Sequence, residues 1–291
     1  MKLFRVSFLD SMNCGANHRE EFNDNDKKWD IFKQSYETNY LSSKRISDGN
    51  IPKLVHQIWL GSQYPERYLK WQKSWNIFNP DWQYVLWDDQ SIRNIKMFNE
   101  DIFRKTNNYG AKSDIARYEI LYQYGGLYVD TDIECLKSFN ILNSICDFYA
   151  GLYSSKEDTL NNALIGTIPR HPIIKECIRS IKCIDNSNDA DTIFHSTGPK
   201  LFTEAFRAKN RSENKVNITF PVSFFFPFPA RMRFSQRHVL KYIRPESYAI
   251  HYWHVSWQPP AGNKSKYYWR IVNRIPFKIK NKVLKYFGKP F

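Results

Sequence analysis

The stretch from Ala111 to Asp132, AKSDIARYEILYQYGGLYVDTD, decides the fold. In its first part, apolar residues recur at spacings of four, three and four, at Ala111, Ile115, Tyr118 and Tyr122. This spacing predicts a helix over residues 111–124 with one buried face. Gly125-Gly126 ends the helix, and Leu127-Tyr128-Val129 then predicts a short buried strand. The strand runs directly into Asp130-Thr131-Asp132, so two carboxylates stand at its carboxyl end.

The segments before this stretch predict a parallel sheet. Residues 53–60 (KLVHQIWL) and 82–87 (WQYVLW) are strand candidates, and residues 68–78 carry apolar side chains at helical spacing. The order strand, helix, strand indicates a βαβ unit, in which the two strands are parallel. Three further elements are expected downstream, namely strands at 148–153 and 163–168 and a helix at 172–184. We therefore predict an α/β fold.

Composition divides the chain into three parts. Residues 1–50 are polar and end in the turn signal Ser47-Asp48-Gly49-Asn50, so we expect an auxiliary helical segment. Residues 51–261 contain the predicted sheet and form the expected catalytic domain. Residues 262–291 carry nine Lys or Arg residues and no Asp or Glu. Because this tail also contains Ile, Val, Leu, Phe and Trp, it predicts a basic amphipathic helix on an anionic membrane surface, with a solvated charged tail as the alternative.

The net charge of +14 indicates an anionic partner, which could be a nucleic acid, an acidic membrane or a phosphorylated substrate. A nucleic-acid-binding protein would carry Lys and Arg along a recognisable binding module, and the sequence contains none. We therefore expect no nucleic acid partner. The 16% aromatic content suits stacking on rings or sugars.

The cysteines and the N-terminus indicate a reducing compartment. Five cysteines without a CxxC pair suggest neither a disulfide framework nor a zinc ribbon. Arg5 and Asp10 interrupt the apolar N-terminal stretch, which is too short for a signal peptide, and no run reaches the 18 apolar residues of a membrane span. We expect a cytoplasmic protein, or one peripheral on the inner face of the cytoplasmic membrane.

Asp130 and Asp132 are candidate ligands of a divalent cation, Mn²⁺ or Mg²⁺, which would neutralise charge on a departing nucleotide diphosphate. The DxD pattern alone carries little weight, because the chain holds two more, at 24–26 and 189–191. Both lie in polar, turn-rich stretches and are expected to be solvated loops. Only Asp130 and Asp132 follow a helix, a Gly-Gly turn and an apolar strand, the context of a ligand site at a sheet edge.

Asp114 and Arg117 are three residues apart and share one face of the predicted helix. They form either a surface ion pair or a pair that grips donor sugar hydroxyls and a phosphate oxygen. A phosphohydrolase of the haloacid dehalogenase type also places DxD after an apolar strand. That class usually has Thr or Val two residues after the second Asp, where this chain has Glu134.

The combined pattern resembles glycosyltransferase family 32, which includes fungal initiating mannosyltransferases and bacterial capsule and lipopolysaccharide enzymes. The run from Ser113 to Asp132 looks like the DxD sugar-binding region of that family. Four further segments are similar to the family's pattern: residues 51–59 (IPKLVHQIW), residues 79–82 (NPDW) with Trp87, Asn162-Ala163, and residues 251–257 (HYWHVSW). The resemblance covers about residues 51 to 258.

The resemblance implies a GT-A fold with a Rossmann-like, mostly parallel central sheet. It implies a retaining, metal-dependent transfer of a hexose or N-acetylhexosamine from a nucleotide-diphosphate sugar to a saccharide acceptor. Such an acceptor would belong to capsule or O-antigen synthesis and could be linked to polyprenyl diphosphate. No Asp or Glu stands out as a nucleophile, so transfer on the face of the leaving group is favoured.

The resemblance also implies the site residues. Ile58 and Trp59 would cover the base, Asp114 and Arg117 would hold the sugar, and Asp132 would bind the metal most directly. The full donor-binding set is Ile58, Trp59, Asp114, Arg117, Tyr128, Asp130, Asn162, Ser256 and Trp257, and the metal set is Asp130, Asp132 and His251. Asp114, Arg117 and Asp132 are the expected catalytic residues. The Gly often found before Ser-Trp in the family is missing here, which leaves His251 or His254 as the ligand.

Overall fold

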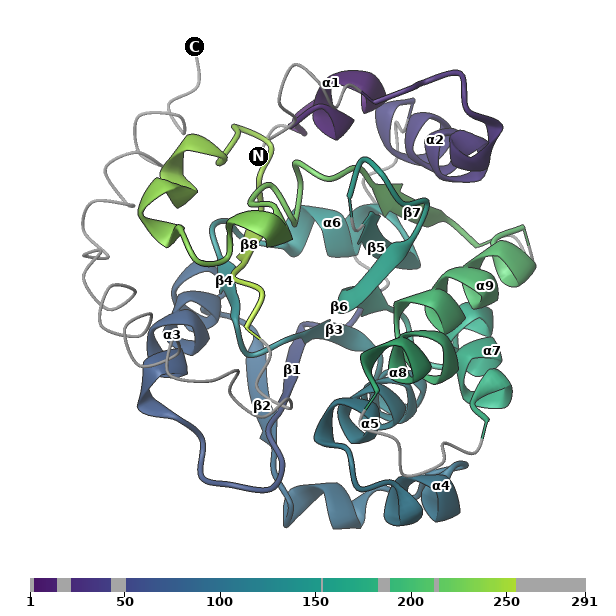
Figure 1. Ribbon diagram of the computed structural model, residues 1–291, viewed down its shortest axis with the longest axis vertical. Helices are drawn as coiled ribbons and strands as arrows, with labels where there is room; N and C mark the ends of the chain where they lie inside the picture. Colours follow the sequence, from purple (N-terminus) through teal and green to yellow (C-terminus); the bar gives the residue numbers. More distant parts are fainter. Residues whose placement is uncertain are drawn as a thin grey trace.

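The computed structural model describes residues 3–14, 22–42, 51–152, 154–182, 189–211 and 215–254. A six-stranded sheet in the order β2-β1-β3-β6-β5-β7 lies at the centre, and a two-stranded ribbon, β4-β8, stands beside it (Figure 1). The strands are β1 (Leu54–Ile58), β2 (Gln83–Trp87), β3 (Gly126–Val129), β4 (Ile133–Cys135), β5 (Phe148–Leu152), β6 (Leu160–Thr167), β7 (Asn217–Phe220) and β8 (Ala249–His251). The α-helices are α1 (Phe8–Met12), α2 (Asp30–Tyr36), α3 (Leu69–Phe78), α4 (Glu100–Lys105), α5 (Tyr109–Tyr124), α6 (Asn140–Ile145), α7 (Pro172–Ser180), α8 (Ala190–Ser196) and α9 (Pro199–Lys209). Shorter helical turns are η1 (Lys27–Trp29), η2 (Glu37–Leu41), η3 (Glu66–Tyr68), η4 (Ser91–Asn94), η5 (Ala230–Met232) and η6 (Gln236–Lys241).

The predicted α/β class with a mostly parallel sheet is confirmed. β1 pairs in parallel with β2 and β3, and β5 pairs in parallel with β7. β6 pairs antiparallel with both β3 and β5, so it is the one described strand of this sheet that runs in the opposite direction. Because β2 and β3 lie on opposite sides of β1, the strand order reverses there. Open α/β sheets bind their ligands in the crevice at such a point, beyond the carboxyl ends of the strands.

Local signals at both ends of α5 fix where this helix leads into β3. The Asn108 side chain accepts hydrogen bonds from the N–H groups of Gly110 and Ala111, so the helix begins two residues before the predicted start. Gly125 and Gly126 have φ angles of 64° and 92°, which favour glycine. A Cβ on Gly126 would also lie 2.8 Å from the carbonyl oxygen of Leu54 on β1. The Gly-Gly turn therefore lets β3 pack beside β1.

Both faces of the central sheet are covered. Neighbouring residues of β5 point to opposite faces, as in any strand. Phe148 packs against Phe202 and Phe206 of α9, whereas Tyr149 packs on Phe139 and donates a hydrogen bond to Asn143 of α6. In Figure 1, α5, α7, α8 and α9 gather on one side of the sheet, and α3 lies on the other. Strands β3, β5, β6 and β7 are therefore buried along their whole length, as expected for a sheet that is covered on both faces.

The N-terminal residues are helical, as expected, and they belong to the main core. Phe32 and Tyr36 of α2 are buried in it. Ser35 donates a hydrogen bond of 2.7 Å to the carbonyl of Asn217, and Thr219 donates one of 3.0 Å to the carbonyl of Phe32. α2 thus covers the edge strand β7, whose unpaired backbone groups would otherwise be open to other strands. The expected tail helix at 262–291 lies outside the described residues.

Several smaller expectations have structural outcomes. The cysteines in the described part of the chain are free and buried: Cys14, Cys135, Cys146 and Cys177. Within the described ranges, no helix combines the length and the apolar character needed to cross a bilayer. The two other DxD patterns lie at the surface, as expected, and each also caps a helix. Asp26 accepts the N–H of Lys28 at the start of η1, and Asp189 accepts that of Thr192 at the start of α8.

Candidate active site

A cavity of about 520 Å³ opens at the carboxyl ends of β1 and β3, where the strand order reverses. Eight of the sequence-predicted site residues line it, namely Ile58, Trp59, Asp114, Arg117, Tyr128, Asp130, Asp132 and Asn162. Helix α8 adds Ala190, Ile193 and Phe194 on the facing side. Ser256 and Trp257 lie outside the described residues. One cavity therefore unites most of the residues that the sequence pattern singles out.

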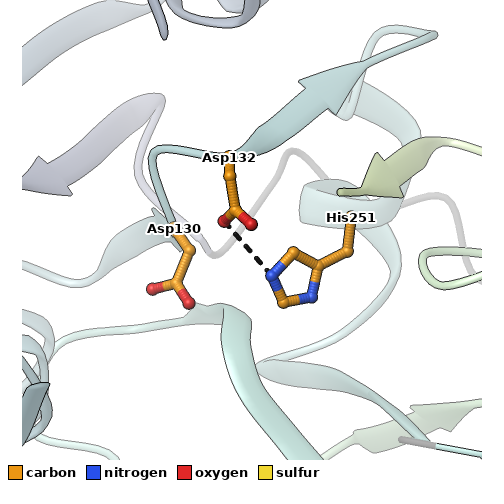
Figure 2. A group of neighbouring side chains, drawn as sticks. All are labelled: Asp130, Asp132 and His251. Carbon is orange, nitrogen blue, oxygen red and sulfur yellow. Dashed lines mark ion pairs between the residues drawn. The ribbon is translucent and has the colours of Figure 1, made fainter. Parts of the chain in front are cut away.

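Asp130, Asp132 and His251 meet beside this cavity, which the two carboxylates and His254 line. Each offers one ligand atom, and these atoms all lie within 4.8 Å of one another. Figure 2 shows the two carboxylates and the imidazole facing one another, with His251 Nε2 3.2 Å from Asp132 Oδ1. The β4–β8 pairing brings them together, because His251 stands opposite Ile133, the residue after Asp132.

The donor set fits a divalent cation. Carboxylate oxygens and imidazole nitrogen suit Mn²⁺ and related ions. Two ligands held about 2.1 Å from one cation at right angles lie about 3 Å apart, close to the observed separation of His251 and Asp132. His251 Nδ1 is buried without a hydrogen-bond partner among the described residues, so Nε2 is the ring nitrogen that meets the carboxylates.

The structure distinguishes the two candidate histidines. The backbone N–H of His254 donates a 2.6 Å hydrogen bond to Asp132 Oδ2, so this residue holds the carboxylate through its main chain. Its ring lies 5.0 Å from the Trp71 ring and within hydrogen-bond distance of Gln236. In the described part of the chain, the group of possible ligands contains His251 and not His254. His251 is therefore the stronger candidate.

Asp114 and Arg117 do not form a surface ion pair, so that alternative is wrong. Their side chains are only 9% and 6% exposed. The Arg117 guanidinium lies 3.1 Å from Asp114, 3.4 Å from Asp130 and over the Tyr128 ring. The Tyr128 hydroxyl donates a 2.8 Å hydrogen bond to Asp130. Arg117 thus links the acidic turn to the helix that precedes it.

Both oxygens of Asp114 are fixed by residues from other elements. Asn162 Nδ2 donates to Oδ1 at 2.9 Å, and Thr197 Oγ1 donates to Oδ2 at 3.0 Å. The Tyr118 hydroxyl in turn donates to the Thr197 carbonyl. Sequence reasoning assigned no chemistry to residues 197–199, which look like an ordinary turn. No local signal identifies Thr197, because its role depends on packing between α5 and the start of α9.

The two carboxylates of the DxD turn differ electrostatically. Burial by itself would raise the pKa of Asp132, but His251 and the backbone N–H of His254 outweigh it and hold this pKa below its ordinary value. Burial raises the pKa of Asp130, and Arg117 offsets that effect only in part. Asp132 is therefore the carboxylate that stays ionised most readily. Its role as the most direct metal ligand stays a prediction.

Aromatic side chains form one wall of the cavity. The Trp59 ring lies 5.4 Å from the Tyr68 ring and 5.8 Å from the Tyr64 ring, and its indole N–H donates to Ser62. Ile58 completes this wall at the end of β1. The cavity therefore has an apolar, aromatic side next to an acidic side that contains one arginine. A planar ring and a charged diphosphate could lie side by side in it.

Comparison with known proteins gives consistent results. Residues 65–150 match the glycosyltransferase sugar-binding region containing a DXD motif. Inositol phosphoceramide mannosyltransferase 3 from Schizosaccharomyces pombe (strain 972 / ATCC 24843) is 30% identical over 155 residues, which are 51% of this chain and 43% of that protein. Uncharacterized glycosyltransferase L373 from Acanthamoeba polyphaga mimivirus is 30% identical over 179 residues, which are 58% of this chain and 70% of that protein. The solved PaToxG glycosyltransferase superposes with a TM-score of 0.45 at 19% identity, over 65% of this chain and 82% of that one.

The chain belongs to the family of glycosyltransferases whose sugar-binding region contains a DXD motif. Membership of this family favours glycosyl transfer over the phosphohydrolase alternative. The chain spans less than half the length of the Schizosaccharomyces pombe relative, so the full activity of that relative does not transfer to it.

Proposed function

We propose that this protein transfers a hexosyl or N-acetylhexosaminyl group, with retention, from a nucleotide-diphosphate sugar to a saccharide hydroxyl. The observation that carries the proposal is the convergence of Asp130, Asp132 and His251 beside the cavity of about 520 Å³, which both carboxylates line. These three residues would hold Mn²⁺ or Mg²⁺. When bound, the cation would neutralise the charge that develops on the departing diphosphate.

The residues around this group have separate tasks in the proposed reaction. The aromatic wall with Trp59 would stack on the base. Asp114 would accept hydrogen bonds from the sugar hydroxyls, since Asn162 and Thr197 fix its carboxylate in one orientation. Arg117 would stabilise negative charge on the leaving group, because a buried guanidinium acts in a region of low dielectric constant.

The environment of the carboxylates supports transfer on the face of the leaving group. Described residues contribute three acidic side chains to the cavity, namely Asp114, Asp130 and Asp132. Both oxygens of Asp114 are hydrogen-bonded, and the other two carboxylates belong to the candidate metal group. None is therefore left as an evident nucleophile. In the proposed step, the bond between the anomeric carbon and the diphosphate oxygen breaks, the acceptor oxygen bonds to that carbon, and the acceptor proton passes to the departing phosphate.

The acceptor of the transferred sugar is the second substrate of the proposed reaction. The Schizosaccharomyces pombe relative is named as a mannosyltransferase of inositol phosphoceramide, a lipid that carries a polar headgroup. From the sequence we expected an acceptor of capsule or O-antigen synthesis, carried on polyprenyl diphosphate. The name of this relative mentions no such acceptor. We therefore extend the proposed acceptors to the polar headgroup of a glycolipid. Peripheral attachment to an anionic membrane would bring the enzyme to either kind of acceptor.

Release of nucleotide from UDP- and GDP-sugars in the presence of Mn²⁺ tests the proposal. We expect one donor to be hydrolysed, EDTA to stop the reaction, and Asp132→Asn to slow it about 100-fold, since the variant loses several kcal/mol of charge stabilisation. Asp26→Asn is the matched control, because it alters another DxD pattern while asparagine remains a good helix cap. Hydrolysis by Asp132→Asn at the wild-type rate would show that the metal assignment is wrong. An inverted anomeric product in NMR spectra would contradict retention.

A further inference from the structure

A strongly basic segment, residues 230–244, lies between β7 and β8. It contains five Lys or Arg residues and no Asp or Glu. Two short helical turns, η5 and η6, make up most of it. The cations are Arg231, Arg233, Arg237, Lys241 and Arg244, and all except the half-buried Arg233 are exposed. None of them lines the donor cavity, so the charge of this segment needs an explanation of its own.

The inner side of the basic segment is apolar and packed. Val239 and Ile243 are buried in the same cluster as Trp71 of α3. The backbone is also hydrogen-bonded, since the N–H of Tyr242 donates a 3.1 Å bond to the carbonyl of Val239. The exposed cations therefore lie on the outer side of a segment that the core holds in place.

Phe234 is an exposed aromatic residue among these cations. It is 66% exposed, and the guanidinium of Arg233 lies 4.8 Å from the centre of its ring. A phenyl ring gains free energy when it moves from water into an apolar phase. At a membrane surface, such a ring enters the boundary between headgroups and acyl chains while neighbouring cations meet anionic lipids. Phe234 and the cations beside it fit this environment.

Other partners fit the basic segment less well. A symmetric dimer formed through it would place the same positive patch on both copies, which would repel each other. A single-stranded nucleic acid stacks successive bases on several aromatic rings. Among the described residues of the segment, Phe234 is the one exposed ring. A bilayer with anionic lipids needs only the cations and one apolar side chain.

The basic segment is connected to the donor cavity. The side chain of Gln236 in η6 lies 3.1 Å from Nε2 of His254, a residue that lines the cavity. In Figure 1, the yellow-green turns of the segment lie near β8, on the side of the molecule away from α7. A bilayer in contact with the segment would therefore lie close to the donor cavity.

We propose that residues 230–244 form a docking surface for a lipid bilayer that contains anionic lipids. Phe234 enters the headgroup region, and Arg231, Arg237 and Lys241 meet the lipid phosphates. This surface is separate from the basic tail at 262–291. The lipid contact itself does not depend on the proposed function, whereas its use in reaching a lipid-linked acceptor rests on that function.

Flotation of the full chain with vesicles tests the charge of this surface. The vesicles contain phosphatidylcholine, either alone or with about 30% phosphatidylserine, and we expect binding only to the mixed vesicles. Because each cation near such a surface raises partitioning about fivefold, Arg237→Gln combined with Lys241→Gln should weaken binding about 25-fold. The matched control is Lys175→Gln combined with Arg179→Gln. These two cations of α7 are also exposed and four residues apart, and their replacement should leave binding unchanged.

A second pair of variants tests the aromatic ring. Phe234→Ala should weaken binding to the mixed vesicles about tenfold, because the variant has less apolar surface to bury in the bilayer. Phe98→Ala is the matched control. Phe98 is 73% exposed and precedes α4, which lies away from the basic segment in Figure 1. This control should bind as tightly as the wild type.

Several results would refute the docking surface. They are a wild type that binds neither kind of vesicle, an Arg237/Lys241 variant that binds as the wild type does, and a Phe234→Ala variant without any loss. Tighter binding of a single-stranded oligonucleotide than of the mixed vesicles would also overturn it, in favour of a nucleic acid partner. Donor hydrolysis in solution should be unchanged in all these variants. Its absence in the wild type would contradict the proposed function and leave the vesicle result unaffected.

Discussion

Replacement of Thr197 by valine should reduce activity more than it reduces stability. The substitution keeps the volume of the side chain and removes the hydroxyl that donates a 3.0 Å hydrogen bond to Asp114 Oδ2. A hydrogen bond to a charged group contributes about 1.5–3 kcal/mol. Since Asn162 and Arg117 still hold the other oxygen, we expect the lower end of this range. That corresponds to a loss of about tenfold in kcat/KM for donor hydrolysis if the bond orients Asp114 toward the sugar.

The assay compares three variants at equal donor and Mn²⁺ concentrations and measures kcat/KM together with the urea midpoint. Thr197→Ser keeps the hydroxyl and should recover most of the activity. Thr219→Val is the matched control, because Thr219 is equally buried and donates a 3.0 Å hydrogen bond to the Phe32 carbonyl, away from the cavity. It should lose stability and keep its activity. The reasoning would be refuted if Thr197→Val stayed within about twofold of the wild type, or if Thr219→Val lost as much activity.

Two further predictions concern the scaffold. His56 accepts a hydrogen bond from Trp87 and donates one to the Gly125 carbonyl, and burial lowers its pKa to about 4. In the unfolded chain the His56 imidazole takes up a proton below about pH 6.5, whereas in the folded chain it does so only near pH 4. The free energy of unfolding therefore falls as the pH drops from 6.5 to 4. Between pH 7.5 and pH 5, the free energy of unfolding measured in urea should fall by about 2 kcal/mol more in the wild type than in His56→Gln. Glutamine is the control because it can keep both hydrogen bonds. Equal losses in the two proteins would contradict the prediction. In Gly166→Ala, the new Cβ would lie 2.1 Å from the Tyr149 ring, so we expect the free energy of unfolding to fall by about 3 kcal/mol. The loss should be smaller when Tyr149 is also replaced by leucine, and urea midpoints of the single and double variants measure the difference.

The elements that sequence predicted share a strong local signal. β1, β2, α3, α5 and β3 each combine hydrophobic periodicity with a clear stop, such as Gly125-Gly126. The ribbon β4-β8 gave no such signal, because its strands have three residues each and exist only by pairing with each other. This ribbon brings His251 to Asp132. The sequence therefore names both His251 and His254 as candidate ligands. Only the register of the β4–β8 pairing shows that His251 is the one whose ring lies beside Asp132.

Burial was the second property that sequence could not supply. The spacing of three residues between Asp114 and Arg117 is the same whether their ion pair is exposed or buried. Their burial depends on α8 and α9, which close over this part of α5 and bring Thr197 to Asp114. No local pattern around Thr197 reports a contact with a residue so far back in the chain.

The buried charges themselves support a ligand site. Taking Asp114 and Arg117 out of water costs several kcal/mol per ion, and well-packed apolar residues of similar volume often give equal or greater stability. The cluster is therefore poorly explained by folding alone. It lines the cavity beside the DxD turn, where fixed charges act most strongly on a developing charge. Of the three DxD patterns in the chain, this one alone has such a setting in the described residues, and the setting distinguishes a candidate ligand site from a helix cap.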